Sequence, residues 1–176
     1  MFVVFEGVNG SGKTTLIEKV AKLLDAKVLA FPRPSIYCTD VSQAEALTEY
    51  SFEVLRMLSE VLDRGKIFIL DRFLASEYVY AKFERTPTMF HVAEVLKYDE
   101  LMRDNYLNIY VKAPLERIKH YVEHTTGALD KLASLYEEFF KLSKCRVLAF
   151  WNEGKVEDIA KHIAEEVKIA KGIMNG

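Results

Sequence analysis

The chain has few cysteines, no long apolar run and no block of like charges. Its two cysteines, Cys38 and Cys145, lie far apart, and neither belongs to a C-x-x-C pair or has a histidine at metal-binding spacing. We therefore interpret both as buried or incidental thiols. This argues against a disulfide framework and against a cysteine-based metal site.

The lack of a long apolar run and of a block of like charges argues against contact with membranes and nucleic acids. No apolar stretch approaches the roughly 18 residues of a membrane span, and the first apolar run begins at residue 2 with no basic leader before it. We accordingly expect a cytoplasmic protein without membrane contact. The formal charge is only −2, and no long run of like charges occurs, so we expect no nucleic-acid partner.

The apolar content of the chain is sufficient for one compact core. Half of the 176 residues are apolar, and no internal repeat, low-complexity tract or linker divides the chain. We expect a single domain over residues 1–176.

Short apolar runs alternate with amphipathic segments of helical length. The runs are typical of buried parallel strands and cover residues 2–6, 27–31, 66–70, 107–112 and 146–150. The expected helices cover residues 13–24, 43–63, 74–83, 88–103, 114–123, 128–143 and 155–171. The alternation predicts an α/β fold with a doubly wound parallel sheet, whose ligands bind at the carboxyl ends of the strands. Residues 84–106 carry no motif that we can assign.

The most specific motif is the segment Gly7-Val8-Asn9-Gly10-Ser11-Gly12-Lys13-Thr14, which matches G-x-x-x-x-G-K-[ST] between an expected strand and an expected helix. In this pattern backbone N–H groups and the positive end of the helix surround phosphates, the lysine adds a cation, and the hydroxyl binds Mg²⁺. The alternative is a glycine-rich turn without a ligand. The predicted triphosphate-binding residues are Gly7, Asn9, Gly10, Ser11, Gly12, Lys13, Thr14 and Thr15.

Charged residues also follow the second and third expected strands. Asp71 and Arg72 come directly after residues 66–70, and Arg33 lies between two prolines after residues 27–31. An aspartate there could organise Mg²⁺ through water or take a proton, and an arginine could bridge phosphates. By itself, Asp-Arg could equally be a solvated ion pair, but its place at a strand end favours the functional interpretation.

The expected helix 43–63 carries an aromatic residue away from its apolar side. Ser42 and Glu45 predict a capping box at its start. One apolar stripe is formed by Leu47, Val54, Leu55, Leu58, Val61 and Leu62. Phe52 and Arg56 fall outside this stripe. Either Phe52 packs under a loop while Arg56 pairs with Glu53 or Glu60, or the two stack on a base and bind its edge.

Taken in order, these residues resemble thymidylate kinases. The resemblance rests on Val4-Phe5-Glu6-Gly7, Gly12-Lys13-Thr14-Thr15, Phe31-Pro32-Arg33, Phe52-x-x-x-Arg56, and Asp71-Arg72-Phe73 followed by Ser76 and Tyr80. It covers the chain well to about residue 83 and residues 146–167 more loosely. It implies a P-loop NTPase fold of three layers, with a five-stranded parallel sheet and helices on both faces.

The resemblance also implies an activity, namely transfer of the ATP γ-phosphoryl group to dTMP with Mg²⁺. By this resemblance Lys13 and Thr14 hold ATP and metal, and Asp71 serves the metal and the nucleophile. The implied acceptor residues are Asn9, Arg33, Phe52, Arg56, Arg72, Ser76 and Tyr80, with Phe52 stacked on thymine and Tyr80 crowding the sugar. A homodimer is also implied.

Two departures from the family pattern concern catalysis. Asn9 replaces the usual aspartate, which makes its contact with the sugar neutral. Gly10 stands where the loop could supply a catalytic arginine, and no arginine lies between Arg117 and Arg146. We predict a short lid near residues 117–130 in which Arg117 supplies the missing charge.

Several alternatives stay open. Lys119 and Lys131 are the other candidate cations near the lid, and His120 and His124 are interpreted as solvated. A deoxynucleoside kinase would phosphorylate a 5′-hydroxyl and would need a carboxylate base there, whereas Arg33 and Arg72 favour a phosphate-bearing acceptor. A regulatory nucleotide-binding protein with weak catalysis is the third possibility.

Overall fold

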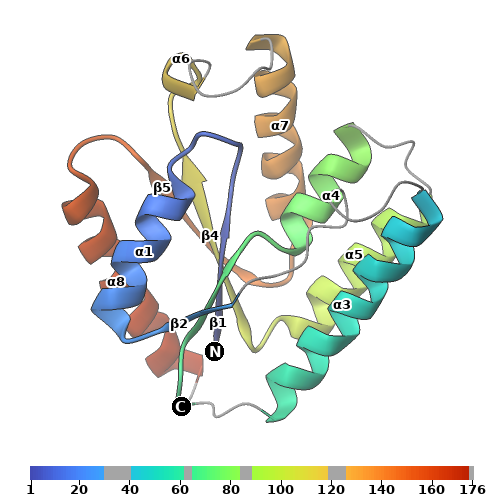
Figure 1. The fold of residues 1–176 in the computed structure, drawn as a ribbon, viewed down its shortest axis with the longest axis horizontal. Coiled ribbons are helices and arrows are strands. Elements are labelled where there is room, and N and C mark those ends of the chain that lie inside the picture. Colours follow the sequence, from blue (N-terminus) through green and yellow to red (C-terminus); the bar gives the residue numbers. More distant parts are fainter. Residues whose placement is uncertain (30–40, 62–64, 84–88, 119–125, 175–176) are drawn as a thin grey trace.

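The computed structural model describes residues 1–29, 41–61, 65–83, 89–118 and 126–174. Its strands are β1 (Phe2–Glu6), β2 (Lys27–Leu29), β3 (Phe68–Asp71), β4 (Tyr106–Lys112) and β5 (Arg146–Trp151). Its helices are α1 (Lys13–Leu24), α3 (Val41–Val61), α4 (Leu74–Phe83), α5 (Met89–Met102), α6 (Leu115–Ile118), α7 (Thr126–Leu142) and α8 (Val156–Met174). Figure 1 shows their arrangement.

The strands form one parallel sheet in the order β2-β3-β1-β4-β5. The central strand β1 pairs with β3 on one side and β4 on the other, so the strand order reverses at β1. Phe5 lies opposite Asp71 in this register. Ligands of doubly wound sheets bind at such a switch point, beside the carboxyl ends of the strands. The segment that follows β1 therefore lies where a ligand is expected.

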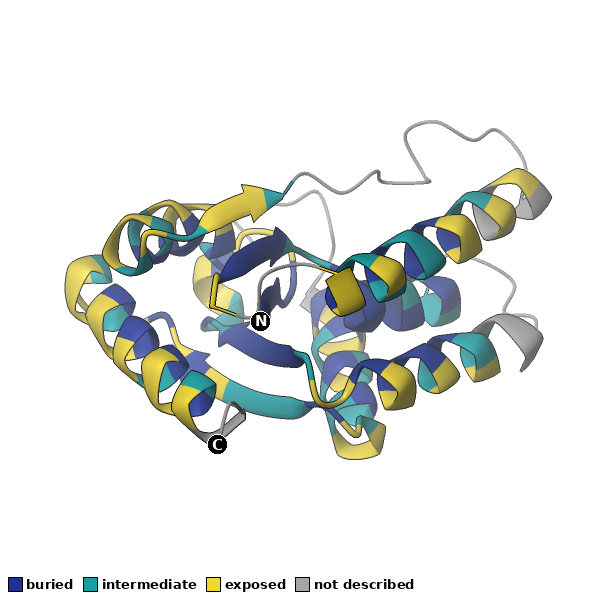
Figure 2. Cartoon of the chain, turned by 90° about the horizontal axis from the view of Figure 1, so that it is seen from below, coloured by how far each residue is buried: buried dark blue, intermediate teal, exposed yellow. Residues whose placement is uncertain are grey.

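Alternation along β1 divides the core into two layers. Successive side chains of a strand point to opposite faces. Val3 and Phe5 pack with α1 and α8, whereas Phe2 and Val4 pack with α3, α4, α5 and α7. Figure 2 shows that the central strands β1, β3 and β4 are buried between helices whose outer sides are exposed. The predicted α/β fold, with a five-stranded parallel sheet and helices on both faces, is confirmed.

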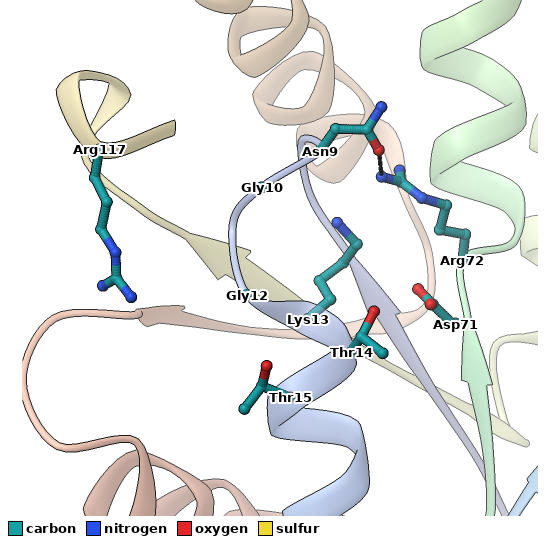
Figure 3. Close-up of a pocket in the computed structure, with 9 residues that line it drawn as sticks. All are labelled: Asn9, Gly10, Gly12, Lys13, Thr14, Thr15, Asp71, Arg72 and Arg117. Carbon is teal, nitrogen blue, oxygen red and sulfur yellow. Dashed lines mark hydrogen bonds between the residues drawn. The ribbon is translucent and has the colours of Figure 1, made fainter. Parts of the chain in front are cut away.

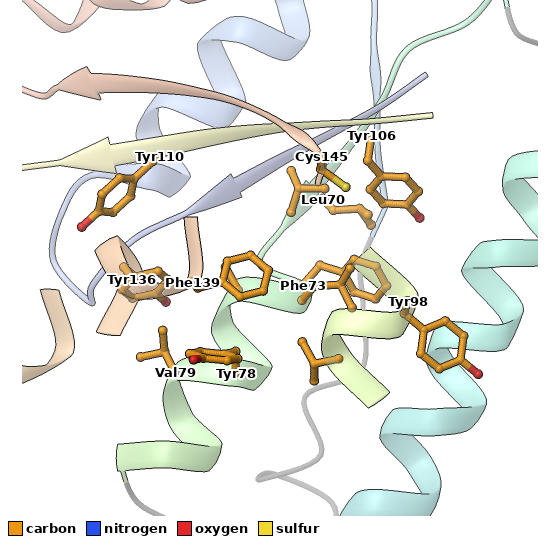
Figure 4. Close-up of a cluster of buried hydrophobic side chains, with 14 of the residues drawn as sticks. Leu70, Phe73, Tyr78, Val79, Tyr98, Tyr106, Tyr110, Tyr136, Phe139 and Cys145 are labelled. Atoms are coloured by element: carbon orange, nitrogen blue, oxygen red, sulfur yellow. The ribbon is translucent and has the colours of Figure 1, made fainter. Parts of the chain in front are cut away.

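The second layer is rich in aromatic side chains (Figure 4). The rings of Phe2 and Tyr106 are stacked with centroids 4.9 Å apart, and Phe73 lies 5.7 Å from Tyr106. Such pairs contribute beyond the area that they bury. The cluster packs α4 and α5 against the sheet, and thereby places the residues that follow β3.

Most predicted elements lie within two residues of the observed ones. The helices expected at 13–24 and 74–83 agree with α1 and α4, while β3 begins at Phe68 and includes Asp71. The helix expected at 114–123 is described only as α6, and its remainder lies outside the described residues. None of the described helices has the length and hydropathy that crossing a membrane requires.

The predicted buried face of α3 is only partly right. Leu55 of the predicted stripe is 3% exposed, but Val61 of the same stripe is 75% exposed, and Phe52, which lies outside the stripe, is 1% exposed. The rings of Phe73 and Tyr98 lie 5.2 and 5.0 Å from the Phe52 ring and enclose it. The helix is therefore rotated toward Phe52, because aromatic partners on α5 and at the start of α4 cover that side. The side chains of Ser42 and Glu45, the predicted capping box, lie outside the described part.

Candidate active site

The loop between β1 and α1 needs glycine at two positions for steric reasons. Gly7 has φ 139°, and a Cβ there would lie 2.4 Å from the carbonyl oxygen of Val111. Gly12 has φ 89°, and its Cβ would lie 2.1 Å from Asn152 Nδ2. Both conformations are unfavourable for residues with a side chain. The backbone can thus pass close to β4 and to the end of β5.

The N-terminus of α1 is open to an anion. Gly12 is its N-cap and makes no side-chain capping bond, and the first turn carries no acidic residue. The unpaired N–H groups and the helix dipole favour negative charge at this end. The buried Lys13 ammonium donates to the carbonyl oxygens of Gly7 and Val8, both at 2.8 Å. A cation is thereby held across the mouth of the loop.

A cleft of about 420 Å³ opens beside this loop. Its volume lies within the usual range for small-molecule sites. The lining residues come from the loop, α1, the end of β3 and α6, and are Asn9, Gly10, Gly12, Lys13, Thr14, Thr15, Asp71, Arg72 and Arg117 (Figure 3). The structure therefore brings together the predicted phosphate loop, the Asp-Arg pair and the predicted lid arginine.

Arg72 directly follows β3 in a strained conformation. Its φ is 74°, which is uncommon for a residue with a side chain and costs about 1–3 kcal/mol. Its backbone N–H donates to the Phe5 carbonyl at 3.0 Å. Its guanidinium donates to Asn9 Oδ1 at 2.6 Å, and its carbon lies 5.6 Å from the Tyr80 ring centroid. The turn thus directs a cation into the cleft.

Glu6 is a fully buried carboxylate behind Arg72. Its Oε1 accepts hydrogen bonds from the backbone N–H groups of Phe73 (2.7 Å) and Ser76 (3.2 Å), at the N-terminus of α4. Its Oε2 accepts a bond from Ser76 Oγ at 2.5 Å. Burial raises the pKa of Glu6, while the Ser76 hydroxyl and the charge of Arg72 act in the opposite direction. Glu6 therefore ties the end of β1 to the start of α4.

Arg117 reaches the cleft from the other side of the loop. Figure 3 shows its guanidinium on the opposite side of the phosphate loop from Arg72. Its Nη1 donates to the Asn152 carbonyl at 2.8 Å. The Asn152 amide in turn donates to the Ser11 carbonyl at 2.7 Å, so the residue after β5 supports both the loop and Arg117.

Thr14 and Asp71 could hold a magnesium ion. Both line the cleft, and a hydroxyl and a carboxylate are the oxygen ligands that Mg²⁺ prefers. Two protein oxygens would leave the other positions of an octahedron to phosphate oxygens and water. The donor set therefore fits the predicted ion.

The predicted base-binding pair does not line the cleft. Phe52 is buried among aromatic rings and offers no open face to a base in this structure, so its role in stacking stays a prediction. Arg56 donates to Glu53 at 3.0 Å and to Glu60 at 2.6 Å, as in the alternative interpretation. A base could reach Phe52 only if that ring left its partners.

The other predicted residues fall into two groups. Ser76 and Tyr80 lie on α4 and contact Arg72, and Lys131 on α7 lies 5.5 Å from the Phe83 ring centroid. Outside the described residues lie Arg33, Lys119, His120, His124 and half of the segment predicted as a lid.

Three residues at the site received no predicted role. Glu6 belongs to the motif Val4-Phe5-Glu6-Gly7 and falls at the carboxyl end of a strand, where ligands are expected, and Asn152 follows the last apolar run, but the sequence pattern gives neither a chemical role. Tyr136, whose hydroxyl lies 2.8 Å from Arg72 Nη1, sits in an amphipathic helix without a motif. Nothing in the sequence pattern distinguishes it from a core residue.

Comparisons with known proteins agree with this geometry. No family model matches the chain. The thymidylate kinase of Acholeplasma laidlawii is 27% identical over 175 residues, covering 87% of each chain. The thymidylate kinase of Geobacillus thermodenitrificans is 29% identical over 157 residues, covering 73% of this chain and 68% of that one.

Solved structures with the same fold are also kinases or bind nucleotides. The Bacillus subtilis YorR protein, solved with phosphorylated GDP, has a TM-score of 0.72 and 19% identity, covering 96% of each chain. Candida albicans thymidylate kinase has a TM-score of 0.64 and 18% identity, covering 97% of this chain and 92% of that one. M. mycoides deoxyadenosine kinase, solved with dCMP and dCDP, has a TM-score of 0.64 and 17% identity, covering 96% and 99%. At these identities the likeness shows the fold.

Proposed function

We propose that this chain, a thymidylate kinase-like P-loop kinase, transfers the γ-phosphoryl group of ATP to a deoxynucleoside monophosphate, first of all dTMP. One observation carries the proposal. The cleft joins a donor-phosphate site, Lys13 and the start of α1, to a second cation, Arg72, with Asp71 and Thr14 beside them. A transfer between two phosphates needs positive charge at both ends of the cleft.

The donor side would act mainly through electrostatics. Backbone N–H groups of the loop, the α1 dipole and Lys13 surround the β- and γ-phosphates, where negative charge must be stabilised. Bound Mg²⁺ would neutralise phosphate charge, with Thr14 and Asp71 as its protein ligands. These groups are already in place around the cleft, so little reorganisation is needed during the reaction.

The acceptor side supports a phosphate-bearing acceptor. Arg72 offers planar N–H donors that suit a phosphate dianion. The buried carboxylate behind it, Glu6, accepts three hydrogen bonds from Phe73 and Ser76, and these bonds hold it at the start of α4. A deoxynucleoside kinase would instead need a carboxylate directed at a 5′-hydroxyl. It is kept as the second candidate because a deoxyadenosine kinase shares the fold.

An ADP-release assay with each of the four dNMPs and four deoxynucleosides tests the proposal. We expect turnover with dNMPs, fastest with dTMP, loss of activity in EDTA, and recovery with added Mg²⁺. Turnover with deoxynucleosides alone would establish the second candidate. No turnover with any acceptor, together with ATP binding measured by calorimetry, would instead indicate a regulatory nucleotide-binding protein.

A further inference from the structure

The hydroxyl of Tyr136 lies behind the acceptor-side arginine. Tyr136 on α7 is fully buried, and its ring stacks with Tyr110 and Phe140 at centroid distances of 5.7 and 6.3 Å. Its hydroxyl lies 2.8 Å from Arg72 Nη1 and 2.9 Å from Ser76 Oγ. Figure 4 shows the ring among those of Tyr110 and Phe139. A buried hydroxyl is thus directed at the group that would meet the acceptor.

The protons of these hydrogen bonds can be assigned. Ser76 has one hydroxyl proton, which it donates to Glu6, so Ser76 Oγ must accept from Tyr136. Tyr136 therefore accepts from Arg72 and donates to Ser76. Burial raises the pKa of Tyr136, which keeps this donor protonated. The result is one directed chain, Arg72 to Tyr136 to Ser76 to Glu6, in which each bond polarises the next.

The same bonds determine which edge of Arg72 remains for a ligand. A guanidinium has five N–H donors. Nη1 donates to Ser76 and Tyr136, and Nη2 donates to Asn9. Among the described residues, Nε–H and the second Nη2–H have no hydrogen-bond partner. The Nε–Nη2 edge of a guanidinium is the one that can bind two oxygens of one phosphate, and Nε–H on this edge is available.

Arg72 needs such support because its backbone is strained. A residue at φ 74° keeps that conformation only where its surroundings determine it strongly. Ser76 contacts the guanidinium from the same turn and helix, whereas Tyr136 contacts it from a different element, 64 residues away. The tyrosine therefore connects α7 to the orientation of Arg72.

We propose that Tyr136 is a positioning residue that orients the Nε–Nη2 edge of Arg72 toward the phosphate of the acceptor nucleotide. The inference rests on the proposed function in one respect, namely that Arg72 meets an acceptor phosphate. Tyr136 lies outside every motif of the chain, and its effect is expected on the acceptor side of the reaction only. Thymidine lacks the phosphate, so its binding does not depend on this edge.

The test compares two substitutions in the same aromatic stack. Tyr136→Phe removes the hydroxyl and keeps the ring, and Tyr110→Phe does the same to the neighbouring buried ring, for which no hydrogen bond to Arg72 occurs among the described residues. We expect Tyr136→Phe to raise the KM for dTMP by about tenfold, the effect of losing a hydrogen bond to a charged group. The KM for ATP and the calorimetric affinity for thymidine should stay within twofold of the wild type. Tyr110→Phe should change none of the three.

A second measurement separates this inference from the proposed function. The Nε–Hε signal of Arg72 in a ¹⁵N NMR spectrum is identified by its loss in Arg72→Lys, and its line shape reports guanidinium rotation without any need for turnover. We expect Tyr136→Phe to shift this signal and speed rotation, with Tyr110→Phe unchanged. A wild type that turns over no dNMP would refute the function while the NMR comparison still decides the positioning. An unchanged Arg72 signal in folded Tyr136→Phe, or equal effects of both variants, would overturn the inference.

Discussion

Lys13 and Arg72 are the two cations in the centre of the cleft, and they are held in different ways. The Lys13 ammonium rests on two carbonyl oxygens of its own loop, so an incoming phosphate can compete for the same charge. The Arg72 guanidinium is held by side chains from the loop, α4 and α7. At the residue scale, Lys13 is held by the backbone of its own loop, whereas Arg72 is held by side chains from three parts of the chain.

Lys13→Ala should abolish turnover and leave dTMP binding largely intact. We expect the lysine to contact the donor phosphates and to matter most as charge develops between donor and acceptor. Loss of a preorganised donor of this kind costs about 2.7–4 kcal/mol in the barrier. Steady-state kinetics and dTMP calorimetry measure the two effects. A variant with more than about a tenth of wild-type activity would contradict a catalytic role for the loop, since that loss is under 1.4 kcal/mol.

Arg117→Ala should lower kcat by about 10²-fold or more with little change in the KM for dTMP, as for an interaction made mainly in the transition state. The guanidinium already lines the cleft, where it is held by the Asn152 carbonyl. Kinetics with both substrates varied separate two roles. A raised KM for ATP with kcat intact would make Arg117 a donor-binding residue, since it lies across the loop from Arg72. Lys131→Ala, on α7 beside Phe83, serves as the matched cation control.

Phe52→Ala should destabilise the protein strongly. Truncating a buried phenylalanine costs about 3–5 kcal/mol in the free energy of unfolding. The packing of Phe52 against Phe73 and Tyr98 places it in that class. Urea denaturation measures the loss, and Phe52→Leu, which keeps much of the volume, should lose less. If Phe52→Ala unfolded like the wild type but bound dTMP more weakly, the ring would instead be a stacking platform.

At the scale of elements, α7 supports the site through its packing against α4. Tyr136 on this helix is hydrogen-bonded to Arg72, which lies just before the start of α4. A second link between the two helices involves Tyr78 and Lys82 on α4. Glu138 on α7 accepts hydrogen bonds from both, each at 2.5 Å. The two helices are therefore connected twice. The buried link at the cleft is the bond between Tyr136 and Arg72, and the half-exposed link further along is formed by the bonds to Glu138.

The half-exposed link should depend on pH. Hydrogen bonds from Lys82 and from Tyr78 lower the pKa of Glu138. A carboxylate with a lowered folded pKa stabilises the protein above its ordinary pKa, and that stability is lost as pH falls through the lowered value. Since the pair is partly exposed, Glu138→Gln should cost less than about 1 kcal/mol at pH 7. The difference should shrink as pH falls below the ordinary carboxyl pKa of about 4.3 and the carboxylate is protonated.

Urea denaturation of the wild type and Glu138→Gln at pH 7 and pH 3 measures this dependence. Glu165→Gln is the matched control, because Glu165 is an exposed carboxylate on α8 with no ion pair in the described part of the chain. A Glu138→Gln difference that persisted at pH 3 would show that packing, rather than the charge, is lost.

At the scale of the whole molecule, one helix carries an exposed apolar stripe. Tyr50, Met57 and Val61 on α3 are 68%, 57% and 75% exposed. Their spacing of seven and four residues places them on one side of the helix. Exposed apolar side chains gathered on one face are typical of a protein interface. The stripe lies opposite the Phe52 side of α3, so it is available to a second molecule.

The resemblance to thymidylate kinases predicts a homodimer, and this stripe is where we expect it to form. Met57→Asp should shift the mass measured by light scattering from two chains to one, because a charge in an apolar interface is costly. Leu101→Asp, on the exposed side of α5, is the matched control and should leave the mass unchanged. A wild type that is monomeric at high concentration would refute the dimer.

Some features of the site follow from local chemistry and could be predicted. The phosphate-binding loop from Gly7 to Thr14 could be predicted because close backbone approach requires glycine, and because a helix start without a side-chain cap suits phosphate. Asp71 and Arg72 could be placed because the carboxyl ends of parallel strands meet at one edge of the sheet. These arguments need only neighbours in sequence and the alternation of strands and helices.

Other features depend on which helices meet. The buried side of α3 could not be predicted from its own apolar stripe, since Phe73 and Tyr98, from other elements, enclose Phe52. Asn152 supports the loop only because β5 ends beside it, 141 residues along the chain from Ser11. In both cases the decisive partner is distant in sequence, and no local pattern identifies it.

The sequence by itself determined the α/β alternation, the phosphate loop and the charged turn after β3, because each follows from periodicity or backbone geometry within a few residues. Only the tertiary structure decided that Arg72 is held by Tyr136, which lies on a different helix 64 residues away. A hydrogen bond depends on distance and direction within a few tenths of an ångström. That precision arises from the packing of α4 and α7 on the sheet, which the order of residues alone does not specify.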